Sequence, residues 1–373
     1  MFFNYDGTMG LFPLAFFETG FGLNVGARFV YKDLWSKGGS LGLRASYGGR
    51  FKQIYSAKAT SGRLLGDRVS VDWGASFQIF TGSGFSGIGN RNLVAASTVS
   101  MPADPTQTAV ATRYRHDDAR VELGLVARLA ERLSLRGSVT VIEREFPNEP
   151  PDNGSVMTRD VYDRALLAGA TGLNNVMTDV ELTYDSRRAT RDYLPTAVPA
   201  AGWRLSAFAG FARGLVDRDP SRYVRYGADV QRYIDIWGGD RVLILRGHLE
   251  GVTADLESVP FLDLPHLGGP QLLRGYSRQR FRDRVAGLVS VEYMYPIQRN
   301  ISGYLFADMG RVYRALDAIS TDNLRVGFGG GIQLHSQRTF VMRTWIGSTS
   351  DGGFVFNIGF DPVYDHRSRK DNP

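Results

Sequence analysis

Long stretches of this 373-residue chain alternate apolar and polar residues one by one. Between Phe21 and Lys32, phenylalanine, leucine, valine, alanine and tyrosine take every second position, and glycine, asparagine or a basic residue takes most of the others. A period of two is typical of β-strands whose two faces meet different surroundings. The fold is therefore expected to be all-β. The same pattern recurs at 69–79, 133–141, 324–335 and 354–360.

A lipid bilayer explains this alternation better than a soluble core does. The alternating segments are long, often roughly 12 to 20 residues, whereas strands of soluble proteins usually have five or six. The face opposite the apolar one carries arginine, aspartate, glutamine and glycine, as the wet lumen of a barrel does. No run of 18 apolar residues occurs, which excludes a helical membrane protein. We therefore predict a transmembrane β-barrel.

Sixteen antiparallel strands are expected, an even number as in bacterial barrels. Short turns at 298–300 and 336–337 alternate with long polar stretches at 147–173 and 254–283, which matches short periplasmic turns and longer outer loops. The segment 91–100 is included because, without it, long and short connections would fall on the same side. The predicted strands are 10–17, 20–33, 40–58, 69–82, 91–100, 108–129, 132–146, 174–187, 202–215, 221–236, 240–253, 284–297, 300–314, 323–335, 338–349 and 353–361.

One domain is expected, with the barrel at 1–361 and a charged tail at 362–373. The chain has no cysteine, which excludes disulfides, thiolate zinc sites and thiol catalysis, and which is compatible with an oxidising compartment such as the periplasm. The net charge of +6 is spread along the strands rather than gathered on one face, so nucleic acid is not an expected partner. No secretion signal precedes the first strand, so we interpret the start as mature or re-engineered.

Three motifs stand in order in the last third of the chain. The stretch GGPQLLRGYSRQRFRDR at 268–284 holds a Leu-Arg-Gly-Tyr sequence, and the next two strands hold Val-Glu-Tyr and Phe-Ala-Asp-Met-Gly sequences. Together they resemble the bacterial surface-antigen superfamily, which includes BamA, TamA and the two-partner-secretion transporters. In that family a long outer loop folds back into the lumen. The motif residues are Arg274, Gly275, Tyr276, Glu292, Asp308 and Gly310.

The alternation places the acidic motif residues inside the barrel. Glu292 lies between outward-facing apolar residues, and Asp308 shares the register of Gly310. An arginine in a confined lumen needs acidic partners, because an unpaired charge leaving water costs several kcal/mol. We therefore predict that Arg274 pairs with Glu292, Asp308 or both, which pins the 254–283 loop inside the lumen. The alternative is that these are ordinary solvated loop charges.

Both ends of the chain carry features of a barrel seam. Residues 351–358 resemble the terminal-strand signal of outer-membrane barrels, which has the pattern polar-x-Gly-x-x-aromatic-x-apolar. At the other end, Pro13 cannot donate a hydrogen bond to a neighbouring strand. The seam between the first and last strands is therefore a possible lateral gate, as in the family, although Pro13 could equally mark only the start of a strand. The terminal-strand residues are Gly353, Phe356, Ile358 and Phe360.

No catalytic residue, metal site or cofactor is expected. Residues 82–87 match G-x-G-x-x-G by letter, but no helix follows to hold a pyrophosphate, and we interpret them as a turn. The five histidines are scattered without metal-ligand spacing, and no G-x-S-x-G motif occurs.

The resemblance implies a non-enzymatic multi-pass barrel of the Gram-negative outer membrane that acts in protein insertion or translocation. Its partners would be outer-membrane lipid, lipopolysaccharide and an unfolded or exported client protein. The family usually carries periplasmic POTRA domains, and some members a patatin domain, before the barrel. Here the first strand begins near residue 10, so either the chain was trimmed or it is a barrel-only member that needs a periplasmic partner or a homodimer. Two alternatives stay open: a passive diffusion pore, and a barrel phospholipase for which no serine stands out.

Overall fold

The computed structural model describes residues 2–3, 8–18, 22–34, 38–48, 52–66, 68–148, 155–189, 198–238, 241–335 and 340–359. Strands make up 63% of this chain, and one large antiparallel sheet holds all of them but one two-stranded piece. The prediction of an all-β fold is therefore confirmed. Within the described ranges, no helix has the length and apolar character needed to cross a bilayer.

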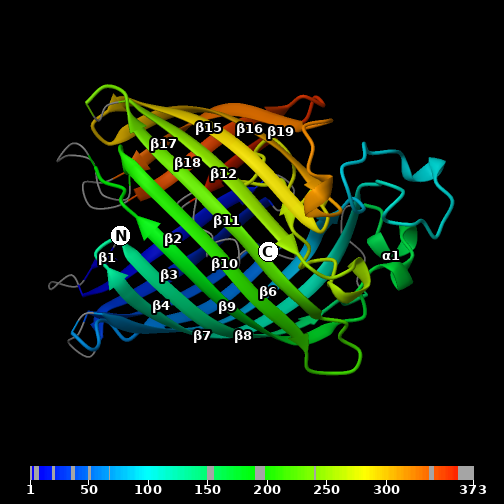
Figure 1. Cartoon of the computed structure of the whole chain (residues 1–373), viewed down its shortest axis with the longest axis horizontal. Coiled ribbons are helices and arrows are strands. Elements are labelled where there is room, and N and C mark those ends of the chain that lie inside the picture. The colour runs from blue at the N-terminus through cyan, green and yellow to red at the C-terminus, as the bar shows by residue number, and fades with distance from the viewer. Residues whose placement is uncertain are drawn as a thin grey trace.

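Sixteen strands of the described chain are paired in a ring (Figure 1). Each pairs antiparallel with the strand before and after it, and the last, β19, pairs with the first, β2. The ring consists of β2 (Met9–Glu18), β3 (Gly22–Leu34), β4 (Gly39–Tyr47), β5 (Lys52–Thr60), β6 (Val69–Phe85), β7 (Thr112–Ala130), β8 (Leu133–Glu145), β9 (Leu173–Asp185), β10 (Gly202–Gly214), β11 (Arg222–Asp235), β12 (Val242–Val252), β15 (Val285–Gln298), β16 (Ile301–Tyr313), β17 (Arg325–His335), β18 (Phe340–Thr349) and β19 (Phe354–Gly359).

Three short strands lie outside the ring. The first, β1 (Phe2–Phe3), pairs with β2. The other two, β13 (His266–Leu267) and β14 (Phe281–Arg282), pair with each other within the connection from β12 to β15. This connection, residues 253–284, is called the inward loop below.

The two faces of the wall differ as a period of two requires. On β15, Val289 is 61% exposed on the outer face, whereas its neighbour Ser290 and the nearby Glu292 are buried. Successive side chains of a strand point to opposite faces. An alternation of apolar and polar residues therefore gives the wall one apolar face and one polar face. Other exposed apolar side chains on the ring include Leu23, Val25, Trp73, Phe77, Leu123, Leu125, Val139, Val141, Leu305 and Phe328.

The three longest connections all lie at one end of the ring. The connections 86–111, 146–172 and 253–284 all join strands at one end, where α1 (Thr158–Val161) also lies. Turns such as 131–132 and 299–300 are at the other end. In Figure 1 the long-loop end with α1 is on the right and the chain begins on the left. In barrels of this kind the short turns face the periplasm.

The expected number of sixteen strands is right, although two of the strands were predicted wrongly. The predicted strand 40–58 is a hairpin of β4 and β5, because alternation continues on both sides of its glycine-containing turn and hides the reversal. The predicted strand 91–100 is instead a loop with one 3-10 turn, η1 (Ala96–Thr98). The first error gives one strand too few and the second gives one too many, so the strands that follow still run in the predicted directions. The turn expected at 82–87 is also wrong for most of its length, since β6 continues to Phe85.

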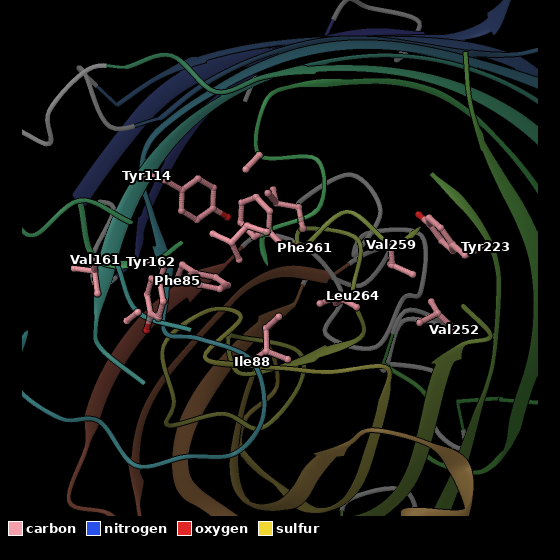
Figure 2. Close-up of a cluster of buried hydrophobic side chains, with 14 of the residues drawn as sticks. Phe85, Ile88, Tyr114, Val161, Tyr162, Tyr223, Val252, Val259, Phe261 and Leu264 are labelled. Atoms are coloured by element: carbon pink, nitrogen blue, oxygen red, sulfur yellow. The ribbon is translucent and has the colours of Figure 1, made fainter. Parts of the chain in front are cut away.

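The long loops pack against one another at the mouth of the barrel (Figure 2). Buried apolar side chains from the three long connections meet those of neighbouring strand ends and form one hydrophobic cluster. This packing buries the outer part of the inward loop and holds it over the lumen. The cluster includes Phe85, Ile88, Tyr114, Val161, Tyr162, Tyr223, Val252, Val259, Phe261 and Leu264. The predicted tail 362–373 lies outside the described residues.

Candidate functional site

The loop tip, residues 268–276 of the inward loop, lies against the inner face of the wall. Arg274 donates from Nε and Nη2 to the two carboxylate oxygens of Asp308 on β16, at 2.8 Å each. Its Nη1 donates to Oε2 of Glu292 on β15 at 2.6 Å. All three side chains are at most 2% exposed. The structure thus brings together the arginine and the two acids that the motifs single out. Arg274 pairs with Asp308 through two hydrogen bonds and with Glu292 through one.

Further groups complete this cluster. The Arg274 guanidinium lies 3.8 Å from the centre of the Phe306 ring and donates to the Ser290 hydroxyl at 3.2 Å. Arg343 on β18 contacts the same Glu292 oxygen at 2.6 Å, so this carboxylate lies between two guanidinium groups. Two arginines and two acids leave the cluster without net charge, which is the condition for burying it at all.

Glycines let the tip backbone touch the wall. Gly275 has φ +101°, and a β-carbon there would collide with the carbonyl oxygen of Ser348 on β18. On β17, a β-carbon at Gly327 would overlap the carbonyl oxygen of Arg274, and Gly310 similarly leaves room for a loop leucine. The tip is therefore in backbone contact with the wall, which adds to the side-chain pairs.

Tyr276 extends the contact toward the last strand. Its hydroxyl donates to Asp351, in the turn between β18 and β19, at 2.8 Å, and its ring packs edge-on against Phe281. Partial burial raises the pKa of Tyr276. The loop tip thus contacts every strand from β15 to β18 and the turn before β19.

A second set of contacts holds the inward loop to strands β8, β11 and β12. Asp263 accepts from Arg144 on β8 and from the Tyr223 hydroxyl on β11, both at 3.1 Å. Arg144 also donates to Asp118 on β7 at 2.9 Å, so it pairs with one acid of the wall and one acid of the loop. Arg246 on β12 donates to the Gln271 carbonyl at 2.8 Å. Sequence reasoning missed these residues and Arg343, because no motif singled them out.

One cavity of the lumen is lined by polar and charged side chains. It has a volume of about 120 Å³ and lies between the inward loop and strands β5 to β9, β11 and β12. Its lining carries charges of both signs, among them Lys58, Arg120, Glu122, Asp179, Arg225 and Glu250. In the described part of the chain, no group of three or more histidines and acids could hold a metal ion.

The seam that closes the ring is short where the structure describes it. β19 pairs with β2 at two positions, Asn357 with Glu18 and Ile358 with Phe17, whereas β18 and β19 pair at six. Pro13 lies in β2 opposite Ala27 of β3. Of the terminal-strand residues, Gly353 lies in the turn before β19, Phe356 and Ile358 are partly exposed, and Phe360 lies outside the described residues.

A closed antiparallel barrel with an apolar outer wall and a loop held in its lumen is the architecture of an outer-membrane barrel. Residues 35–359 match the Omp85 superfamily domain, so the chain belongs to the Omp85 superfamily. Barrels of this superfamily are outer-membrane proteins, and the predicted resemblance is confirmed. A search of curated proteins found no match.

Solved structures of similar fold include one of BamA and two of CdiB. BamA from Haemophilus ducreyi lacking POTRA domains 1-3 is similar with a TM-score of 0.63 and 16% identity, over 95% of this chain and 70% of that one. CdiB from Acinetobacter baumannii gives 0.57 and 12%, over 94% of this chain and 59% of that one. CdiB from Escherichia coli gives 0.57 and 10%, over 94% and 62%. At these identities the likeness concerns the fold.

Proposed function

We propose that this barrel acts in the insertion of proteins into, or their translocation across, the outer membrane, with a lateral gate at the β2–β19 seam. The observation that carries the proposal is the inward loop held against strands β15 to β18, next to the junction of the first and last strands. The client would be an unfolded or exported protein, and the surroundings would be outer-membrane lipid and lipopolysaccharide. A periplasmic partner or a second copy of the barrel would deliver the client.

Arg274 acts in this proposal as the pin of the inward loop. Removing one partner from a buried ion pair leaves an uncompensated charge and costs about 3–5 kcal/mol. The pin joins the loop to β15 and β16, and Arg343 carries the same network to β18, one strand before β19. The loop therefore braces the wall next to the seam.

The seam joins the first and last strands of the ring, and its described part pairs Asn357 with Glu18 and Ile358 with Phe17. Pro13 removes a backbone donor from β2. Opening here exposes strand edges with unsatisfied backbone groups, to which a client strand can add.

A passive pore fits these contacts less well. The long loops pack together over the mouth, and the tip of the inward loop is held against the inner face of the wall. We do not expect a large, steady conductance through a mouth covered in this way. Small and flickering conductance in planar bilayers supports the gated barrel, and large, steady conductance supports the pore.

A disulfide across the seam tests the gate. The chain has no cysteine, so Phe17→Cys with Ile358→Cys places one pair at a directly opposed position, which suits disulfide geometry. The matched control, Ala15→Cys with Val25→Cys, joins β2 to β3 away from the seam. The assay is the folding rate of a urea-unfolded eight-stranded outer-membrane barrel in vesicles that contain the protein.

We expect the seam disulfide to abolish the acceleration and a reductant to restore it, while the control pair has no effect. Equal activity of the two oxidised variants would contradict the gate. A wild-type barrel that accelerates neither folding nor translocation of any unfolded client would contradict the function itself.

A further inference from the structure

Two arginine–tryptophan pairs lie on the outer face of the barrel at its short-turn end. The Arg232 guanidinium lies 4.8 Å from the centre of the Trp203 ring, and the two residues are register partners on β11 and β10. The Arg241 guanidinium lies 5.9 Å from the Trp237 ring centre, in the turn between β11 and β12. Trp237 is 69% exposed and Trp203 41%, so neither ring is part of a protein core.

The two pairs are neighbours on one surface, called the Arg–Trp surface below. Arg241 donates from Nη1 to the Tyr293 hydroxyl on β15 at 3.1 Å, which extends the surface over four adjacent strands. Trp73 is the other exposed tryptophan of the described chain, and its register partners are Ala59 and Leu123 rather than arginines. The arginine–tryptophan pairing is therefore a local feature and not a general property of the rim.

The position of the Arg–Trp surface along the barrel axis matches the boundary between the hydrocarbon core of the bilayer and the lipid headgroups. On β11 the outer face carries exposed Val224 and Val230 and then Arg232. Eight residues at about 3.3 Å each, tilted by about 40°, place Arg232 roughly 20 Å from Val224 along the barrel axis. The apolar band of such barrels is about 25 Å tall, so the guanidinium lies where lipid phosphates begin.

We propose that the Arg–Trp surface binds the phosphate headgroup of an anionic phospholipid in the leaflet at the short-turn end. Tryptophan favours the interface because its ring is amphipathic, and a guanidinium over its face keeps planar N–H donors for bidentate contact with phosphate. Asp235, the last residue of β11, accepts the backbone N–H of Trp237 at 3.1 Å. With two arginines and this one acid the surface keeps a net positive charge, which an anionic headgroup complements.

This site lies far from the seam. In the ring, β10 is the eighth strand counted back from the β2–β19 junction, so the Arg–Trp surface occupies the far side of the barrel. A lipid bound there contacts the part of the wall opposite the seam, which stays closed when the seam opens. The site depends on the barrel lying in a membrane and not on any role in insertion or export.

Native mass spectrometry of the delipidated barrel tests the site, with phosphatidylglycerol and phosphatidylcholine of the same acyl chains as probes. We expect the wild type to retain phosphatidylglycerol about tenfold better than phosphatidylcholine. Arg232→Gln with Arg241→Gln should remove that preference. The matched control is Arg222→Gln, which removes an exposed arginine from the same outer face of β11 at the opposite end.

Two results overturn the proposal: equal retention of the two lipids by the wild type, or an equal loss of phosphatidylglycerol in the Arg222 control and the double variant. Heat-modifiable mobility in gels checks that each variant is folded. If the double variant does not fold, the wild-type preference between the two lipids and the single variant Arg241→Gln still decide the outcome.

Discussion

Replacing Arg274 by methionine should destabilise the docked loop by about 3–5 kcal/mol. Methionine keeps the length of the side chain and its contact with the Phe306 ring, but removes the guanidinium from Asp308 and Glu292. Glu292 keeps Arg343, whereas Asp308 keeps only neutral donors among those recorded, the backbone N–H of residue 274 and the Ser290 hydroxyl. The cost arises mainly at Asp308, as an uncompensated buried charge.

The charge balance gives a sharper form of this prediction. Adding Asp308→Asn to Arg274→Met leaves the Arg343–Glu292 pair, which is neutral as a whole. The double variant should therefore be more stable than the sum of the two single changes predicts, by about 1–3 kcal/mol.

The assay combines urea unfolding in lipid vesicles with hydrogen–deuterium exchange of the loop tip. Exchange separates release of the tip from unfolding of the barrel, because local opening exposes only the loop amides. An Arg274→Met variant with wild-type exchange at the tip, or additive costs in the double variant, would refute the reasoning.

Three further predictions concern the inward loop. Asp263→Asn should speed hydrogen–deuterium exchange of the outer part of the loop and lower the free energy of unfolding by about 1–2 kcal/mol. The control Asp255→Asn, which removes an acid that is 86% exposed, should leave exchange of the loop unchanged. Gly275→Ala should lower the urea midpoint more than Gly352→Ala, because both have positive φ but only the first would collide with the wall; equal shifts would contradict the close contact. Deleting the loop tip should convert small, flickering conductance in planar bilayers into a large, steady one, and unchanged conductance would show that the tip does not obstruct the lumen.

The sequence predicted best what depends on neighbouring residues. Alternation along one strand decides which side chain faces lipid, so the outward position of Val289 and the inward position of Glu292 follow from local order alone. The same rule failed at 40–58, because a short turn does not interrupt the alternation on either side of it.

Contacts between distant segments were predictable only where a motif marked them. Arg274, Glu292 and Asp308 carry such marks, and the structure places them together. Asp263 and Arg144 do not, although they pair across 119 positions. Their meeting depends on how the inward loop packs with the other long loops, which no local pattern of residues records.

Spin-label accessibility along β15 tests the account most directly. Single cysteines at positions 288 to 293 of the cysteine-free chain, labelled and placed in lipid vesicles, would be measured for collision with oxygen, which partitions into hydrocarbon. High accessibility at Val289 and Val291, alternating with low values at Ser290 and Glu292, is the result expected of a wall with lipid on one side and a filled lumen on the other. Values without a period of two, or with the opposite phase, would contradict it.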